Sequence, residues 1–340
     1  MFLFTILAII IGLVVYVICG KEKEVYTSVS ELSWFKLVIK VVYKLVKYRK
    51  QGVLQLDKSL VYVAGTGNAD CTLEISARNH TITVQGIRVD EENVAKYKFL
   101  CGYNANDGDI PLCYAESLFM KPLIALISST KFSLSPIGLI HIRQNIKQFI
   151  PLQEYIKAQL TLEVSVKQYR QYDRGVEVDI NLRAMASNTC VWEGMMTLLS
   201  RGQRSTPKSR PPGGNNGTYE FEDDLDVPGN CGVDYAKLTG DWNPHHLYTW
   251  SAWLLGYKKP IAHGMWTLSR TIAELQRRYE MTLDGQYELS CAFKRPLFMP
   301  GKAVMKYDDP MLADNSVCKI LVEERDTSIP HLTASLRKLY

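Results

Sequence analysis

The sequence lacks the short motifs that mark common metal and redox sites. Its eight cysteines include no CxxC pair, and it contains no H-E-x-x-H string and no cluster of Cys and His residues with zinc-ligand spacing. The thiols are therefore expected to be buried or incidental, and neither a zinc knuckle nor a disulfide framework is predicted. No metal ion is expected.

The chain also lacks a strong excess of either charge and lacks the composition of a disordered protein. It has 40 Lys and Arg residues against 35 Asp and Glu residues, a formal charge of +5 over 340 residues. This modest excess does not indicate a nucleic-acid-binding surface, and no nucleic-acid partner is expected. With 46% hydrophobic and 22% charged residues, the chain is long enough for two domains, or one doubled domain, each with its own core.

What is present begins with a long apolar stretch, FLFTILAIIIGLVVYVIC, at residues 2–19. A helix of this length, at about 1.5 Å per residue, just crosses the hydrocarbon core of a bilayer. A secretory signal peptide is the alternative, but this stretch is longer than a usual h-region, has no basic region before it and no good cleavage site after it. Residues 1–20 are therefore predicted to be an uncleaved transmembrane anchor.

Residues 21–50 are predicted to form a basic amphipathic segment beside the membrane. Four lysines recur at helical spacing within WFKLVIKVVYKLVKYRK: Lys36, Lys40, Lys44 and Lys47. They would form one basic stripe that faces away from Leu37 and Val41, and such a stripe suits an anionic lipid surface. The equally favoured alternative is a first domain helix whose lysine face is in solvent.

The rest of the chain divides into two similar halves, each with a helix followed by strands. In the first half, residues 117–129 are apolar on nearly every side and predict a buried helix, and an antiparallel meander follows at 160–166, 176–182 and from 191. In the second half a helix begins close to Gly264, and strands are expected at 287–293, 302–307, 317–323 and 332–339. Residues 202–217, GQRSTPKSRPPGGNNG, read as a linker. The predicted class is α+β, with a sheet around a central helix present twice.

The loop GDWNPHH, residues 240–246, admits three interpretations: half of a metal site, a polar turn before a helix, or an acid/base pair. Asn243 is a good N-cap and Pro244 favours the first helical position, so His246 is predicted to lie in the first turn of a helix and to converge with Asp241. His246 would then share a face with Trp250 and Trp253. The metal interpretation is disfavoured because adjacent histidines on a helix diverge.

The helix that starts near Gly264 adds a second feature to this region. A glycine at a helix N-terminus lets a ligand approach the backbone, and the free N–H there can stabilise an oxyanion with the help of the helix dipole. An acid/base pair and an oxyanion donor within one short stretch together predict a catalytic site. A neighbouring carboxylate would orient the histidine and can raise its pKa.

The segment YAKLTGDWNPHHLYTWSAWLLGYKKPIAHGMW resembles the hydratase signature of the MaoC-like dehydratase family, the (R)-specific enoyl-CoA hydratases of hotdog fold. FKRPLFMPG, residues 293–301, resembles the strand and turn that follow in that family. The first half, with SPIGLIHIRQNIKQFIPL at 135–152, resembles a degenerate repeat without the D-x-N-P-x-H string. The resemblance implies a double hotdog, with a non-catalytic repeat at 51–201 and a catalytic repeat at 218–340.

The resemblance also assigns expected roles to single residues. Asp241 and His246 would hold and activate a water that adds across a trans-2-enoyl thioester, or take up the water lost in the reverse reaction. The Gly264 N–H would bind the thioester oxygen. The expected supporting residues are Asn243 and Pro244, which shape the loop, His263, which orders it, and Lys294 and Arg295, which could meet the phosphates of coenzyme A but are more often simply solvated at a strand end. His141 is expected to be structural.

The implied substrate is an acyl thioester of coenzyme A or of an acyl-carrier protein, with no cofactor, and a homodimer is compatible with the fold. Two alternatives remain: a hotdog thioesterase, and a membrane-tethered protein that binds acyl thioesters without turnover. Lysines that follow the apolar stretch predict a single-pass anchor in the endoplasmic reticulum, with the catalytic domain in the cytoplasm and with membrane lipid as a partner. Two N-glycosylation sequons, at Asn79 and Asn216, oppose this orientation.

Overall fold

The structure is a computed structural model that describes residues 23–47, 60–63, 73–77, 80–136, 138–202, 219–310 and 317–339. The predicted anchor at 1–20, the asparagines of both sequons and nearly all of the predicted linker at 202–217 lie outside the described residues, so these predictions stay untested. Among the described residues, no helix is both long enough and apolar enough to cross a membrane.

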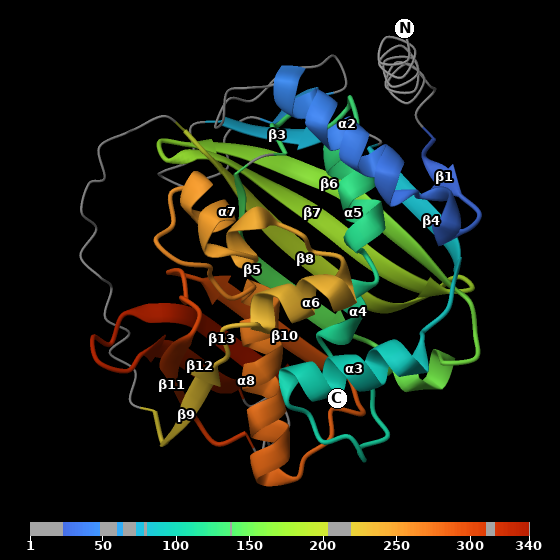
Figure 1. Cartoon of the computed structure of the whole chain (residues 1–340). Coiled ribbons are helices and arrows are strands. Elements are labelled where there is room, and N and C mark those ends of the chain that lie inside the picture. Colours follow the sequence, from blue (N-terminus) through green and yellow to red (C-terminus); the bar gives the residue numbers. More distant parts are fainter. Residues whose placement is uncertain are drawn as a thin grey trace, which may run out of the picture.

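All described strands join one sheet, whose main path is β1-β4-β6-β7-β8-β5-β10-β13-β12-β11-β9, with β3 also paired with β6 and β2 paired with β3 (Figure 1). The strands are β1 (Val25–Tyr26), β2 (Leu60–Val63), β3 (Leu73–Ala77), β4 (Thr81–Ile87), β5 (Leu139–Gln148), β6 (Leu160–Tyr172), β7 (Gly175–Ala186), β8 (Thr189–Arg201), β9 (Phe221–Val227), β10 (Tyr287–Phe293), β11 (Gly301–Tyr307), β12 (Val317–Glu324) and β13 (Pro330–Lys338).

The helices of the two halves lie against one face of this sheet (Figure 1). They are η1 (Val29–Glu31), α2 (Trp34–Lys47), α3 (Glu91–Cys101), α4 (Tyr114–Ser117), α5 (Met120–Ser128), η2 (Leu152–Tyr155), α6 (Cys231–Thr239), η3 (Pro244–His246), α7 (Thr249–Leu254) and α8 (Gly264–Tyr279).

The sheet contains the same strand order twice. In the first half the order is β4-β6-β7-β8-β5, and in the second half it is β9-β11-β12-β13-β10. In each half the strand that ends this series, β5 or β10, is the first one after the long buried helix, α5 or α8. The prediction of a helix followed by a meander, present twice, is confirmed.

The two halves meet where β5 pairs with β10 in antiparallel register. At the middle of this seam Asn145 is the direct partner of Ser290, and its amide donates a hydrogen bond of 2.7 Å to the Ser290 hydroxyl. One continuous ladder therefore crosses from the first half to the second.

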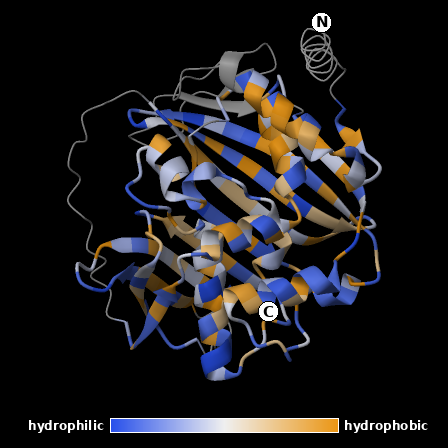
Figure 2. Ribbon diagram, in the orientation of Figure 1, coloured by the Kyte–Doolittle hydropathy of each residue, from blue (hydrophilic) through white to orange (hydrophobic). Residues whose placement is uncertain are grey.

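Alternating hydropathy along the strands explains why these segments form a half-buried sheet (Figure 2). In β6, for example, Leu160, Leu162, Val164 and Val166 are buried while the residues between them are partly exposed. Leu268 and Ile272 of α8 have no exposed surface. Each such side chain stabilises the fold by roughly 1.5–3 kcal/mol when it leaves water.

The prediction of an exposed lysine stripe on residues 21–50 is wrong at Lys44. Its side chain is only 2% exposed, and its ammonium donates hydrogen bonds to the carbonyl oxygens of Ile127, Ser129 and Phe132 at 3.1, 2.6 and 2.6 Å. These carbonyls lie at and beyond the C-terminal end of α5, where a cation is favoured. The helix α2 is therefore docked onto α5 through a lysine.

Candidate active site

The turn that carries Asp241 and His246 differs in part from its prediction. Pro244 does begin a helix and Asn243 has the extended backbone of an N-cap, but its side chain makes no capping hydrogen bond. The helix is a single 3-10 turn, and a new helix, α7, starts at Thr249. Because the helix breaks after His246, the predicted common face with Trp250 and Trp253 is wrong.

Two hydrogen bonds fix His245 and His246 to the segment before α8. The Ile261 N–H donates to the His245 carbonyl at 3.1 Å, and His246 Nδ1 lies 2.8 Å from the Ile261 carbonyl oxygen. Because a carbonyl can only accept, Nδ1 must carry the proton, and Nε2 of the neutral ring keeps its lone pair. Ala262 is held in turn by its N–H, which donates to the Leu297 carbonyl at 2.8 Å.

His263 lies directly against His246. The ring centroids are 3.7 Å apart and the ring planes differ by 26°. His263 Nε2 donates to the Asp241 carbonyl oxygen at 3.1 Å and lies 3.7 Å from its carboxylate. The His263 ring thus connects the turn of Asp241 to the start of α8, in line with the loop-ordering role expected of it.

Burial dominates the electrostatics of these histidines. It lowers the pKa of His246 well below 6.5, with His263 and His245 acting in the same direction and Asp241 opposing them. Burial likewise lowers the pKa of His263 to about 3 and that of His245 to about 4. Asp241 does act to raise the pKa of His246, as expected, but desolvation outweighs the carboxylate and the net shift is downward.

Gly264 is the first residue of α8, as predicted, and lies directly after His263. The first N–H groups of an α-helix have no acceptor within the helix, so they can bind an oxygen. A side chain at this position would meet the Phe293 ring, because a Cβ would lie 2.8 Å from Phe293 Cε1. Glycine is therefore needed here for the close approach of β10 to α8.

Asp241, His246 and His263 each offer an oxygen or nitrogen atom within 4.8 Å of the others, a grouping that could hold a metal ion. The fit is poor. One nitrogen of each ring is taken by a carbonyl oxygen. The two stacked rings also hold their lone pairs in nearly parallel planes, whereas the ligands of one ion must converge. The Asp241 carboxylate, 32% exposed, is the part of the grouping open to solvent.

Two groups of the first half, which sequence reasoning did not place here, act on this site. Glu116 of α4 is buried, and burial, with a further contribution from Asp241, raises its pKa to about 8. His141 of β5 packs its ring edge against Phe293 at 4.9 Å and interacts electrostatically with Asp241. Glu116 lies directly before the apolar stretch at 117–129, and an acidic residue at the end of such a stretch was the signal that could have identified it. His141 gave no such signal.

Lys294 and Arg295 follow β10 and are exposed to solvent. The Lys294 N–H donates to the His331 carbonyl at 2.8 Å, which fixes the backbone and leaves the side chain outside. Both residues are accessible to an anionic ligand.

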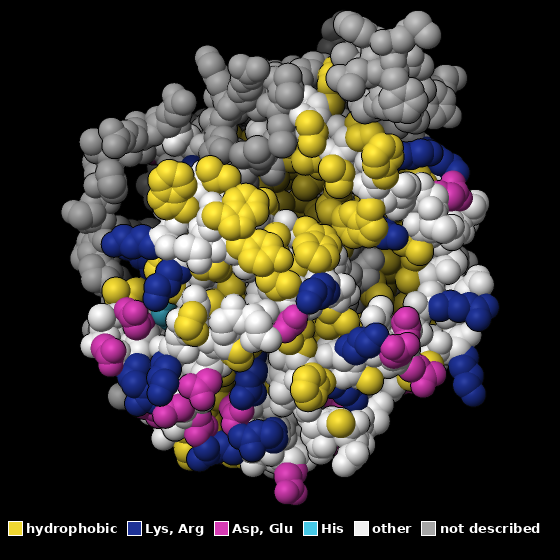
Figure 3. Space-filling model, in the orientation of Figure 1, with side chains coloured by type: hydrophobic (Ala, Val, Ile, Leu, Met, Phe, Trp, Pro, Cys, Tyr) yellow, Lys and Arg dark blue, Asp and Glu magenta, His cyan; other side chains and the backbone are white. Residues whose placement is uncertain are grey.

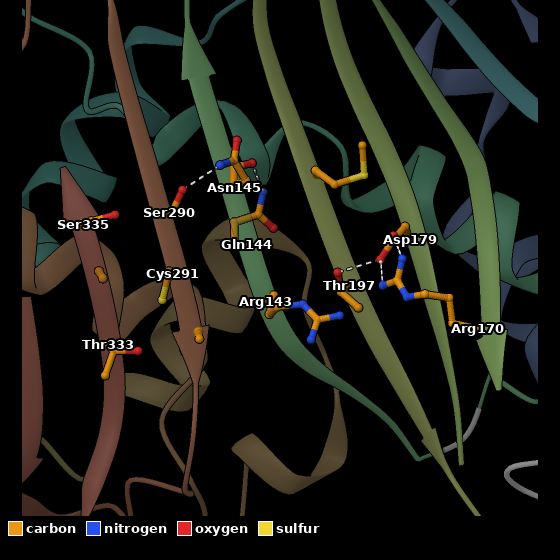
Figure 4. A pocket seen from close by; sticks show the side chains of 13 residues that line it. Arg143, Gln144, Asn145, Arg170, Asp179, Thr197, Ser290, Cys291, Thr333 and Ser335 are labelled. Carbon is orange, nitrogen blue, oxygen red and sulfur yellow. Dashed lines mark hydrogen bonds and ion pairs between the residues drawn. The ribbon is translucent and has the colours of Figure 1, made fainter. Parts of the chain in front are cut away.

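A cavity of about 550 Å³ lies on the sheet face turned away from the helices (Figure 4). It spans β5, β10, β13 and neighbouring strands, and it contains the ion pair of Arg170 with Asp179, to which Thr197 donates a hydrogen bond of 2.8 Å. None of Asp241, His246 and Gly264 lines this cavity. This cavity and the candidate active site are therefore different places.

Comparison with known proteins shows similarity to MaoC-like proteins. Residues 215–308 match the MaoC-like domain. Over 272 residues, which are 77% of this chain and 90% of the relative, the chain is 25% identical to 3-hydroxyacyl-thioester dehydratase X of Mycobacterium tuberculosis. The crystal structure of HtdX from the same organism matches with a TM-score of 0.63 at 25% identity, covering 76% of this chain and 100% of that one.

A MaoC-like dehydratase from Phytophthora capsici matches with a TM-score of 0.59 at 15% identity, covering 76% of this chain and 95% of that one, and shows the fold alone. The D-x-N-P-x-H turn lies within the matched domain, next to the start of α8. Residues 215–308 therefore match a MaoC-like domain, and the chain is similar over about three quarters of its length to a 3-hydroxyacyl-thioester dehydratase and has an α+β hotdog-type fold.

Proposed function

We propose that this protein is a hydro-lyase that hydrates trans-2-enoyl thioesters to (R)-3-hydroxyacyl thioesters, or catalyses the reverse dehydration, in fatty acyl metabolism. One observation carries the proposal: a carboxylate oxygen of Asp241 and a ring nitrogen of His246 lie within 4.8 Å of each other, beside the N-terminus of α8. The relative named as a 3-hydroxyacyl-thioester dehydratase supports the same reaction class.

A separation of up to 4.8 Å between the two groups leaves room for a single bridging water molecule. Two hydrogen bonds of about 2.8 Å each, made at a near-tetrahedral angle, span about 4.5 Å. Asp241 would accept one hydrogen bond from this water and His246 the other. Both groups would thereby orient the water oxygen toward C3 of the enoyl thioester.

The tautomer of His246 suits a general base. Its Nδ1–H is committed to the Ile261 carbonyl, and its depressed pKa keeps the ring neutral. Nε2 would take a proton from the water as the water oxygen bonds to C3, and the electron pair of the C2–C3 double bond would move toward the thioester carbonyl. Return of this proton to C2 completes the addition of one water and leaves the imidazole neutral.

The start of α8 would stabilise the charge that develops in this step. As C3 is attacked, the thioester oxygen gains enolate character, and a free N–H at Gly264 can donate to it while the helix dipole adds favourable potential. The absence of a side chain at Gly264 leaves room for the Phe293 ring beside the backbone.

The direct test is an activity assay on the full-length protein with crotonyl-CoA and longer enoyl-CoA esters, followed by loss of the enoyl thioester absorbance. Asp241→Asn and His246→Gln should each lower kcat/KM by roughly 10²–10⁴-fold at unchanged thermal stability, because each keeps its shape and loses proton handling. The double variant should lose little more than either single variant, since the two residues act on one water.

His245→Gln is the matched control, because His245 is also buried but is tied to Ile261 only through its backbone. It should retain most of the activity. Near wild-type turnover in both Asp241→Asn and His246→Gln would show that the site is assigned wrongly. Release of free coenzyme A thiol in place of hydration would identify a thioesterase.

The remaining properties of the proposed enzyme follow from its substrate. It would use no cofactor, and Lys294 and Arg295, both exposed, are available for the phosphates of coenzyme A.

We further propose that residues 1–20 anchor the chain in the endoplasmic reticulum membrane with the catalytic domain in the cytoplasm, where coenzyme A thioesters are at hand. Carbonate extraction and glycosidase treatment of the expressed protein test this: retention in the membrane pellet without a mobility shift is expected.

A further inference from the structure

Two helices expose large apolar side chains on one face of the molecule. On α7 these are Trp250, Trp253 and Leu254, and on α2 they are Phe35, Val38 and Val42. Their exposed fractions lie between 52% and 70%. Figure 3 shows hydrophobic side chains over both helices, on either side of a hollow that is itself lined with hydrophobic side chains. We call these six residues the apolar face.

The side chains of the apolar face are held outward by the fold. On α2, the opposite side of the helix is committed to the protein, because Leu37 is buried and Lys44 is tied to the end of α5. On α7, the Trp250 ring stacks on Tyr248 with planes 6° apart. Contiguous apolar surface that a soluble monomer keeps exposed marks an interaction site.

The charged residues of α2 and of the segment just after α7 are lysines. Neither α2 nor α7 contains an acidic residue. Lys36 on α2 and Lys258 and Lys259 after α7 are exposed. The nearest acids before α2 are already paired, Glu24 with Lys131 and Glu31 with Lys23. The surface thus combines aromatic and aliphatic side chains with exposed lysines, as interfacial membrane-binding segments do.

The sequence before α2 points to the same partner. The apolar stretch at residues 2–19 ends 15 residues before α2 begins at Trp34. The first described strand, β1, lies at the same end of the molecule as α2 (Figure 1). A chain held in a bilayer by that stretch would bring the apolar face to the membrane surface.

From these observations we infer that the apolar face docks onto the surface of a bilayer containing anionic phospholipid. Tryptophans 250 and 253 would lie at the level of the headgroups, where their amphipathic rings are favoured, and the lysines would meet lipid phosphate.

The position of α7 gives this docking a role. Only Leu247 and Tyr248 separate the catalytic turn at His246 from the first residue of α7. If the proposed function holds, the docked face places the active site beside the membrane, where long-chain acyl thioesters accumulate. This part of the inference rests on the proposed function, whereas the docking itself does not.

The test uses the full-length protein in vesicles of phosphatidylcholine and phosphatidylserine that carry a phospholipid with a diazirine in its acyl chain. After irradiation, lipid adducts should be found on peptides covering α7 and α2. Trp250→Ser/Trp253→Ser should lower the adducts on α7 by at least about tenfold, because two large apolar side chains leave the lipid. Trp250→Phe/Trp253→Phe should keep them.

Phe99 provides the matched control, because it is an aromatic residue of α3, 87% exposed, outside the apolar face. Phe99→Ser should leave the labelling of α7 unchanged. Wild-type adducts confined to residues 2–19, or labelling of α7 no stronger than that of the Phe99 peptide, would overturn the inference and indicate that another protein or another part of the chain covers this face.

Activity separates the two proposals. Asp241→Asn should be labelled like the wild type, because docking does not need turnover. In the same vesicles Trp250→Ser/Trp253→Ser should lose turnover of long-chain enoyl-CoA about tenfold while keeping that of soluble crotonyl-CoA. Strong labelling of α7 without any hydration would uphold the docking and reject the proposed function. Equal losses with both substrates would remove the link between docking and acyl-chain delivery.

Discussion

The imidazole of His246 lies against that of His263, with ring centroids 3.7 Å apart. Both rings are buried, so a proton on either would meet a desolvated site and a neighbouring ring, and the pKa of each is lowered. We therefore expect kcat/KM for crotonyl-CoA to be level from pH 8 down to 6.5 and to fall only at lower pH. A pH–rate profile with an acid limb centred at or above pH 6.5 would contradict this.

Acid should also destabilise the fold, and His80 allows this to be measured away from the active site. His80 is buried beside Ser129 Oγ at 2.6 Å, and burial lowers its pKa to about 4. As pH falls below 6.5 the unfolded chain binds a proton there and the folded chain does not, so stability falls with pH. Between pH 7 and 5 the free energy of unfolding should fall by about 2 kcal/mol less in His80→Gln than in the wild type. If urea titrations showed that both proteins lose the same free energy of unfolding between pH 7 and 5, this prediction would be contradicted.

Glu116 should have the opposite effect. Its pKa is raised from 4.5 to about 8, so the folded protein keeps a proton that the unfolded chain releases between these values, and stability is lost as pH rises. Glu116→Gln carries no such proton. From pH 5 to pH 8 the variant should gain about 3 kcal/mol in free energy of unfolding relative to the wild type. Parallel stability curves for the two proteins would show that the carboxyl is ionised in the fold.

The contact of Gly264 with Phe293 can be tested by a pair of substitutions. Gly264→Ala should lower the melting temperature and the activity, because the new methyl group would lie 2.8 Å from Phe293 Cε1. Adding Phe293→Leu should make room and recover much of the melting temperature. Additive losses in the double variant would indicate that backbone freedom, rather than this contact, requires the glycine.

Lys44→Met tests whether α2 belongs to the fold. The methionine keeps most of the apolar stem and leaves the carbonyls of Ile127, Ser129 and Phe132 without the ammonium, which should destabilise the protein by about 1–3 kcal/mol in urea unfolding. Lys36→Met, on the exposed side of the same helix, is the control and should change the stability by less than about 0.5 kcal/mol. Similar small effects of both substitutions would mean that α2 is not docked in solution.

Local patterns predicted the elements of the second half closely. The alternation of apolar and polar residues predicted β10 at 287–293, and Gly264 with the helical spacing of the apolar residues after it predicted the start of α8. Both features depend on residues close together in the sequence. The pairing of Asp241 with His246 was also accessible, since both belong to one short turn.

What the sequence did not reveal depends on distant residues. Lys44 looked like a solvated lysine because its carbonyl acceptors lie more than 80 residues away in α5 and the loop after it. The pKa of His246 could not be predicted, because burial in the folded core and the neighbouring His263, which lower it, outweigh the nearby Asp241, which raises it. β5 was missed as a strand because both of its neighbours, β8 and β10, come later in the chain.

The seam between β5 and β10 has a consequence during synthesis. β5 is complete at Gln148, whereas its partner in the second half starts at Tyr287, about 140 residues later. At about 5–20 residues per second, one edge of β5 stands open for roughly 7–28 s while the ribosome makes the rest of the chain. An unpaired edge of this kind can pair with the same strand of a neighbouring nascent chain. Slow elongation through residues 149–286 should therefore increase aggregation of this protein in the cell. A chaperone that binds the exposed strand on the nascent chain would act chiefly during that interval.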